Sequence, residues 1–197
     1  MACECPDSRF FQDLADLNQE FLVLLTRRGQ AGGQTLLGLK PAWVEMLRAL
    51  SPDQLASIAR TPCLLASFSS RPTAIAETSS AIPAGDPDWC EAARMFSVAL
   101  MSFLRTTLQH DSLRTALCLG HEKDTPVSLV DVPLGRLHGR AALAAGSLCA
   151  RLAEAPFFWP DLIRAARSEN REFRCLSRLT AIPMFVTSSG TLRTHGP

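Results

Sequence analysis

Apolar residues recur at three- and four-residue spacing along much of this chain, which is the period of an amphipathic α-helix. The clearest stretch covers residues 9–28, where the apolar positions are Phe10, Leu14, Leu17, Phe21, Leu24 and Leu25. Gly29, Gly32 and Gly33 follow and interrupt the pattern. The sequence therefore predicts a first helix that ends just before the glycines.

Proline-containing motifs mark further helix starts. Ser51-Pro52-Asp53 supplies a serine cap, a proline suited to the first helical position and an acidic residue at the positive end of the helix dipole. Asp86-Pro87-Asp88 repeats this arrangement and predicts a long helix through about Gln109. A short helix that begins near Pro41 is expected between the first helix and Ser51.

The remaining segments predict an all-α protein with one open choice. Cys63 to Phe68 is a short apolar run that fits either a strand or another helical turn. The other expected segments are a loop at 69–87, a short helix at 112–119, a polar loop at 121–125, a helical segment at 133–153 and a helix at about 160–181.

The chain divides on these grounds into a helical core, residues 1–109, followed by a second small helical bundle, residues 110–197. Phe21-Leu22 and Leu37-Gly38 recur at unchanged spacing as Phe103-Leu104 and Leu119-Gly120. The second half is therefore either a degenerate repeat of the first or an unrelated helical extension.

Composition narrows the functional classes only slightly. The chain has 197 residues, 47% of them apolar and 20% charged, with a net charge of +1. A near-neutral protein has no global attraction for nucleic acid, so any DNA contact must come from a local patch. No apolar run approaches the roughly 18 residues that cross a bilayer, and the acidic N-terminus does not resemble a signal peptide. We therefore expect a cytoplasmic protein with no membrane partner.

The strongest local patch is a row of arginines: Arg164, Arg167, Arg171, Arg174 and Arg178. On one continuous helix their spacing places all five within one quadrant, opposite Leu162, Phe173 and Leu176. Such a row fits contact with DNA phosphates. The alternative is a solvated helix face whose arginines pair with nearby acids.

Signals for catalysis or metal binding are weak. The four histidines lie in polar segments or near the end of the chain, and there is no HExxH, GxSxG or phosphate-loop motif. The seven cysteines are scattered without a CxxC pair, which favours buried apolar packing over zinc or disulfides. We therefore expect no enzyme activity, cofactor, metal or small-molecule substrate.

The stretch from Asp13 to Phe68 resembles a known family, the flagellar transcriptional activator FlhD. The matching residues include Leu17-Asn18, Phe21 to Leu25, Leu37-Gly38-Leu39, Met46-Leu47, Ala49-Leu50-Ser51, Leu55, Ile58-Ala59, Leu64-Leu65 and Phe68. The resemblance extends over about residues 10–108. It implies a helical homodimer that assembles with a zinc-binding FlhC-like subunit on promoter DNA, and it places Phe10, Leu14, Leu17, Phe21, Leu24 and Leu25 in the dimer interface.

Two departures bear on what the resemblance implies. A cysteine that bridges some FlhD dimers corresponds to Ala66 here. The family's DNA-contacting segment corresponds to Asp86–Arg94, which is acidic here apart from Arg94. We therefore expect a regulator of flagellar, or related transfer or secretion, genes whose DNA contact has moved to the arginine row. The alternative is an adaptor or anti-activator of the same fold that does not bind DNA.

Overall fold

The structure is a computed structural model, and it describes residues 6–27, 36–68, 87–110 and 132–179. Helices dominate these residues, with one small two-stranded sheet, so the all-α prediction is confirmed. The elements are α1 (Pro6–Thr26), η1 (Leu36–Gly38), α2 (Pro41–Arg48), α3 (Pro52–Ala59), β1 (Ala66–Phe68), α5 (Pro87–His110), α8 (Leu134–Ala144), η2 (Ala145–Ser147), β2 (Leu148–Ala150), α9 (Phe158–Arg167) and α10 (Arg171–Leu179).

The helix starts follow the local sequence. Helix α3 begins with a capping box in which the Ser51 hydroxyl accepts a hydrogen bond from the Gln54 backbone N–H, 3.2 Å, and Gln54 Oε1 accepts one from the Ser51 N–H, 2.9 Å. Pro41 and Pro87 are the first residues of α2 and α5. These predicted starts are confirmed because proline at the first helical position sacrifices no helical hydrogen bond.

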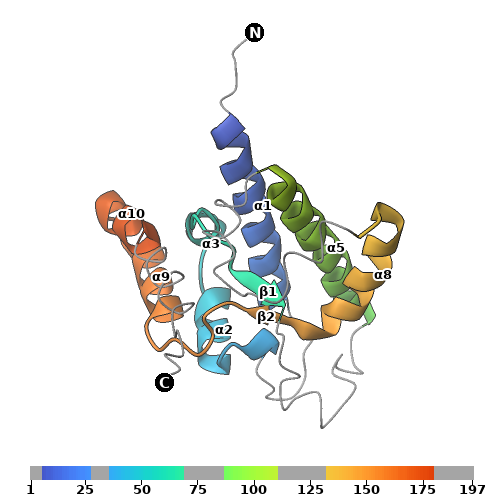
Figure 1. Cartoon of the computed structure of the whole chain (residues 1–197). Helices are drawn as coiled ribbons and strands as arrows, with labels where there is room; N and C mark the ends of the chain where they lie inside the picture. Colours follow the sequence, from blue (N-terminus) through green and yellow to red (C-terminus); the bar gives the residue numbers. More distant parts are fainter. Residues whose placement is uncertain (1–5, 28–35, 69–86, 111–131, 180–197) are drawn as a thin grey trace, which may run out of the picture.

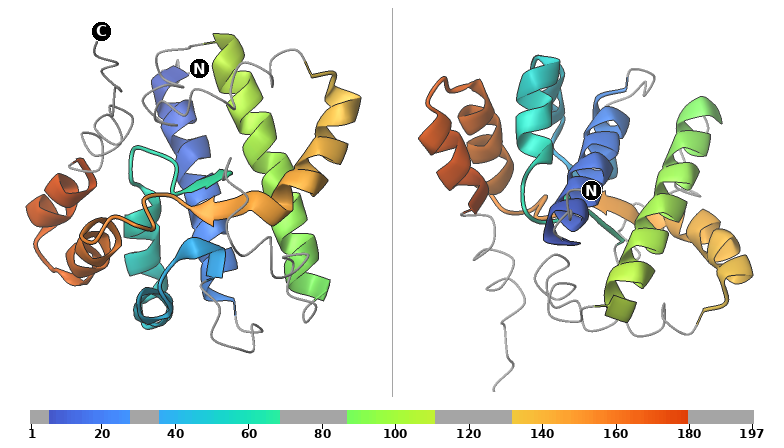
Figure 2. Two further views of the ribbon diagram at one scale, coloured as in Figure 1. Left: turned by 60° about the horizontal axis from the view of Figure 1, so that its bottom comes forward. Right: turned by 90° about the horizontal axis from the view of Figure 1, so that it is seen from above.

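Helices α1 and α5 lie side by side in the middle of the molecule (Figures 1 and 2). Helix α3 packs on α1, and α8 packs on α5. Helix α9 packs against α2 and α3, and α10 packs against α9. Seen from above, α10 and α9 therefore lie at one edge and α8 at the other (Figure 2).

The small sheet joins the two halves of the chain. Strands β1 and β2 are antiparallel, with Ser67 opposite Cys149 at the centre of the register. Leu148 and Ala150 are buried while Cys149 between them is half-buried, which is the alternation of a strand. The strand alternative is therefore correct for the end of the 63–68 run. The helical prediction for 133–153 is correct only as far as Ser147, the end of the 3-10 helix η2, because residues 148–150 pair with β1.

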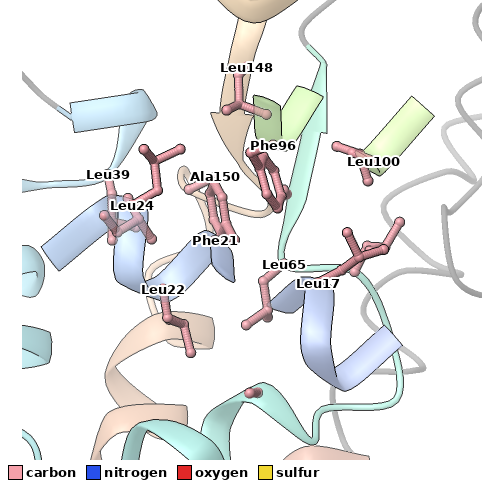
Figure 3. Close-up of a cluster of buried hydrophobic side chains, with 14 of the residues drawn as sticks. Leu17, Phe21, Leu22, Leu24, Leu39, Leu65, Phe96, Leu100, Leu148 and Ala150 are labelled. Atoms are coloured by element: carbon pink, nitrogen blue, oxygen red, sulfur yellow. The ribbon is translucent and has the colours of Figure 1, made fainter. Parts of the chain in front are cut away.

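One hydrophobic core includes side chains from both halves (Figure 3). Phe21 of α1, Phe96 and Leu100 of α5, and Leu148 of β2 belong to it, each 5% exposed or less. The C-terminal half therefore contributes to the same core as the first half. Its strand and helices complete the core of the first half.

A single buried amide fixes the link between α3 and β1 to helix α1. Asn18, 1% exposed, donates from Nδ2 to the carbonyl oxygens of Ala59, Thr61 and Cys63 at 3.0, 3.3 and 2.9 Å. Its Oδ1 accepts a hydrogen bond from the Leu65 N–H at 2.9 Å. The amide thus hydrogen-bonds four backbone groups between the end of α3 and β1.

The predicted helix at 160–181 is wrong as one continuous element. Ser168 is extended, with φ −74° and ψ 139°, and it ends α9. The Asn170 side chain then accepts hydrogen bonds from the N–H groups of Glu172, 2.9 Å, and Phe173, 3.1 Å, and so starts α10. An asparagine that caps a new helix competes with continuation of the old one.

Several predicted segments lie outside the described residues. They are the loop at 69–87 except for Pro87, the helix at 112–119 and the polar loop at 121–125. The glycines after α1 and the Leu119-Gly120 pair also lie outside.

Candidate nucleic-acid interface

Helix α9 carries the first two arginines of the row, Arg164 and Arg167, and they are exposed because the other face of the helix is buried. Trp159 and Ile163 are completely buried, and Trp159 Nε1 donates a hydrogen bond to the Arg151 carbonyl oxygen at 2.9 Å. Arg164 and Arg167 lie on the opposite, exposed side of this helix. The strong amphipathic pattern of α9 therefore fixes which way its arginines point.

The exposed arginines are Arg164, Arg167 and Arg171. The Arg164 side chain is 71% exposed and forms an ion pair with Asp161 at 3.3 Å. Such an exposed pair contributes little to stability and leaves the guanidinium accessible to other anions. Arg167 donates from Nη2 to the Met46 carbonyl oxygen of α2 at 3.3 Å. Arg171 is exposed at the start of α10.

The last two arginines of the row face the protein. Arg174 and Arg178 are half-buried and line a small hollow together with Ser57 and Ile58 of α3 and with α9. Arg178 also donates from Nε to the Arg174 carbonyl oxygen at 3.1 Å. The break at Ser168 therefore leaves three of the five arginines exposed and turns the other two inward.

Helix α10 is oriented opposite to the prediction. Its apolar residues Phe173, Leu176 and Leu179 are 41%, 60% and 49% exposed, whereas the sequence pattern predicted that this side faces the core. The prediction rested on the phase of one continuous helix. Because α10 begins anew at its own Asn170 cap, the phase of α9 no longer sets the direction of its faces.

Arg94 is not brought together with the other arginines. It is exposed on α5, which α1 and α3 separate from α9 (Figure 2). It forms an ion pair with Glu91 on the same helix. The hydrogen bond and the charge of Glu91 raise the pKa of Arg94 above its usual value. The acid on the preceding turn therefore already neutralises this guanidinium.

The residues assigned to a dimer interface lie inside the chain. Leu14, Leu17, Phe21, Leu24 and Leu25 are each 9% exposed or less. Phe21 packs against Phe96 of α5 with ring centroids 5.6 Å apart, and half-buried Phe10 stacks on Phe103 at 5.5 Å. In this chain α5 covers that face of α1, and the dimer interface implied by the resemblance stays a prediction.

The cysteines in the part of the chain that the structure describes do not belong to a metal-binding cluster. No group of three or more His, Cys, Asp or Glu side chains converges there. Cys63 is buried, as the apolar reading predicted, but Cys175 is exposed on α10. His138 is exposed on α8, so the structure places it as a helix-surface residue.

Sequence reasoning missed an open hollow of about 490 Å³ between α1 and α3. Asp16 and Gln19 of α1 and Arg60 beside α3 line it. The Gln19 Oε1 atom is buried there without a hydrogen-bond partner. No local motif predicts this hollow, because it depends on how α1 and α3 cross, where Asn18 and Ala59 are 41 residues apart in sequence.

The described residues thus form a mostly helical protein with three exposed arginines on α9 and at the start of α10. None of the described helices combines the length and the apolar character needed to cross a membrane.

The chain belongs to the FlhD family of flagellar transcriptional activators, whose family model matches residues 1–103. The match runs from the N-terminus into α5, and it confirms the resemblance seen in the sequence. This family consists of transcriptional activators, not enzymes. Neither the curated proteins nor the solved structures include a significant match to the chain.

Proposed function

We propose that this protein regulates transcription of flagellar, or related transfer or secretion, genes in the cytoplasm by contacting promoter DNA together with an FlhC-like partner subunit. Family membership supports the regulatory role. The exposure of the Arg164, Arg167 and Arg171 guanidinium groups is the observation that supports the proposed DNA contact.

Three accessible guanidinium groups suit the phosphate backbone. Arginine presents several N–H donors in a planar fork, which matches phosphate oxygens. Each phosphate that is neutralised releases counterions, so affinity falls as salt rises. The competing Asp161 carboxylate pairs with Arg164 at an exposed position, where a phosphate can replace it. Arg174 and Arg178 have a supporting role in this proposal, because they face α3 and α9.

A mobility-shift titration on flagellar promoter DNA, with and without an FlhC-type subunit, tests the proposal. The variant carries Arg164→Glu, Arg167→Glu and Arg171→Glu. We expect DNA retention to be lost at the salt concentration where the wild type binds. In the low-salt range where the variant still binds, the magnitude of the slope of log affinity against log salt should decrease by up to about 3, at roughly one unit for each phosphate contact. Far-ultraviolet circular dichroism should remain unchanged, since all three side chains are exposed.

The matched control reverses three exposed arginines elsewhere: Arg27, Arg136 and Arg140. This control changes the net charge by the same amount, so it separates a local contact from general electrostatic repulsion. If both variants lose binding equally, or if only the control does, the arginines of α9 and α10 are not the DNA contact.

A second candidate function is an adaptor or anti-activator that binds protein partners alone. The start of α5 favours it, because Asp88 and Glu91 are exposed there and Arg94 is paired with Glu91. Retention of DNA only in the presence of the FlhC-type subunit supports the activator. Absence of retention in every condition, together with capture of that subunit, supports the adaptor.

The homodimer expected from the resemblance stays a prediction. The buried α1 face leaves such a dimer to form through a different surface of the chain.

A further inference from the structure

The elements of the first half recur in the second half at a constant distance along the chain. Ser67 and Cys149, which face each other in the sheet, are 82 residues apart. The same displacement carries α1 onto α5, α3 onto α8 and β1 onto β2. For β1 and β2 the match includes both ends of each strand, and for α3 and α8 it includes the first residue.

Matched positions also share burial and local role. Ser51 and Pro133, which correspond, are the N-cap residues of α3 and α8. Several matched core positions are buried in both halves. Such pairs are Leu14 and Phe96, Leu22 and Leu104, Leu50 and Val132, and Ala59 and Ala141. The correspondence therefore extends from element boundaries to the faces that form the core.

The strand register has the symmetry of a twofold axis. Ala66 lies opposite Ala150, and Phe68 lies opposite Leu148. Ala66 corresponds to Leu148, and Phe68 corresponds to Ala150, so the pair Ala66–Ala150 and the pair Phe68–Leu148 occupy equivalent positions. Ser67 and Cys149 correspond to each other, so their pair lies at the centre of the symmetry. An unrelated extension that added a strand by chance has no reason to choose this register.

The helix packing has the same symmetry. Helix α1 packs on α3, and its counterpart α5 packs on α8. Helices α1 and α5 pack on each other between these two pairs (Figures 1 and 2). We infer that the chain contains two copies of one helix–helix–strand unit, joined in tandem and associated about a pseudo-twofold axis through Ser67 and Cys149. The surface that α1 offers to another copy is thus occupied by the chain's own second copy.

The sequences of the two copies have diverged, so the two sides of the molecule that the pseudo-twofold axis relates have different surfaces. Asn18, which fixes the segment after α3, corresponds to Leu100 in the second copy. On the first copy, Ile58 of α3 is buried and borders the hollow that α9 and α10 line. Its counterpart on α8 is the exposed Arg140. A symmetric homodimer presents two identical partner surfaces, whereas this chain presents one of each kind.

A disulfide placed on the axis tests the inference in the full-length protein. The Ser67 Oγ and Cys149 Sγ atoms are 3.3 Å apart, so Ser67→Cys brings two thiols within bonding reach. The variant is oxidised and analysed by non-reducing electrophoresis and by peptide mass mapping. We expect the 67–149 bond in all of the linked material, at the mobility of one 21.4 kDa chain.

The double variant Ser67→Cys with Cys149→Ala is the matched control, because it keeps every other cysteine and loses only this bond. A 67–149 bond between two chains, seen as a covalent species of twice the mass, overturns the inference. Failure of the bond to form in a variant whose circular dichroism is native also overturns it, since the strands then do not pair.

The wild-type protein provides an independent measurement. An interface within one chain unfolds with a midpoint temperature that does not depend on protein concentration, whereas an interface between chains is stabilised by mass action. We expect no shift of the midpoint over a hundredfold range of concentration. A rise with concentration that Phe21→Ala abolishes means that a second chain supplies the packing across α1, and it overturns the inference. A rise that Phe21→Ala leaves unchanged reports a homodimer through a different surface, which agrees with the inference.

Discussion

Replacing Asn18 by alanine tests how the link between α3 and β1 is held. Asn18 is 1% exposed, and its amide joins four backbone groups that are 41 to 47 residues away in sequence. Alanine removes the donor to three carbonyl oxygens and the acceptor for the Leu65 N–H. The helix itself should persist, because alanine has the highest helix propensity.

The expected cost follows from the groups left without a partner. Each buried polar group that loses its hydrogen bond costs about 1–3 kcal/mol, and relaxation or water can recover part of that. Since Nδ2 shares two hydrogens among three carbonyls, the three contacts do not count as three full bonds. We expect a loss of about 3–5 kcal/mol in the free energy of unfolding. That corresponds to a fall of roughly 6–20 °C in the midpoint temperature for a chain of this size.

Urea denaturation followed by circular dichroism measures this loss. Asn18→Asp should destabilise at least as much, because it keeps the acceptor but places a carboxylate against three carbonyl oxygens. Gln12→Ala is the matched control, since this amide on the same helix makes one exposed hydrogen bond to Asp16. It should change stability by less than about 0.5 kcal/mol. An Asn18→Ala protein within about 1 kcal/mol of wild type refutes the reasoning.

Two further substitutions probe the helix cap and the internal interface. Ser51→Ala removes one half of the capping box and should cost about 0.5–2 kcal/mol in urea denaturation, whereas Ser51→Asp, which restores a capping oxygen, should recover most of it; equal losses in the two variants contradict the cap. Phe21→Ala empties a fully buried site against Phe96 and should cost about 3–5 kcal/mol by the same assay, and a loss below about 1 kcal/mol means that α1 and α5 do not pack as the structure has them.

The helix starts could be predicted because their signals are local. A capping serine, a proline at the first position and the apolar spacing of residues 9–28 all act within one or two turns of the backbone. The starts of α2, α3 and α5 therefore agree with the sequence. The apolar face of α1 was also predicted, but not the fact that α5 of the same chain covers it.

The arginine row shows where local reasoning failed. Its five members were assigned to one face on the assumption of an unbroken helix. Asn170 accepts hydrogen bonds from two backbone N–H groups and starts a second helix, which leaves Arg164, Arg167 and Arg171 exposed and turns Arg174 inward. The asparagine was visible in the sequence, but its capping role becomes decisive only once α9 ends at Ser168.

The starts of α2, α3 and α5, the apolar face of α1, the family and a possible repeat could all be read from the sequence alone. The tertiary structure decided which faces are covered, that residues 148–150 form a strand, and that both halves share one core. The physical reason is the range of the interactions. Caps and helical periodicity act over a few residues, whereas burial and strand register depend on partners such as Ser67 and Cys149, which only the folded chain brings together.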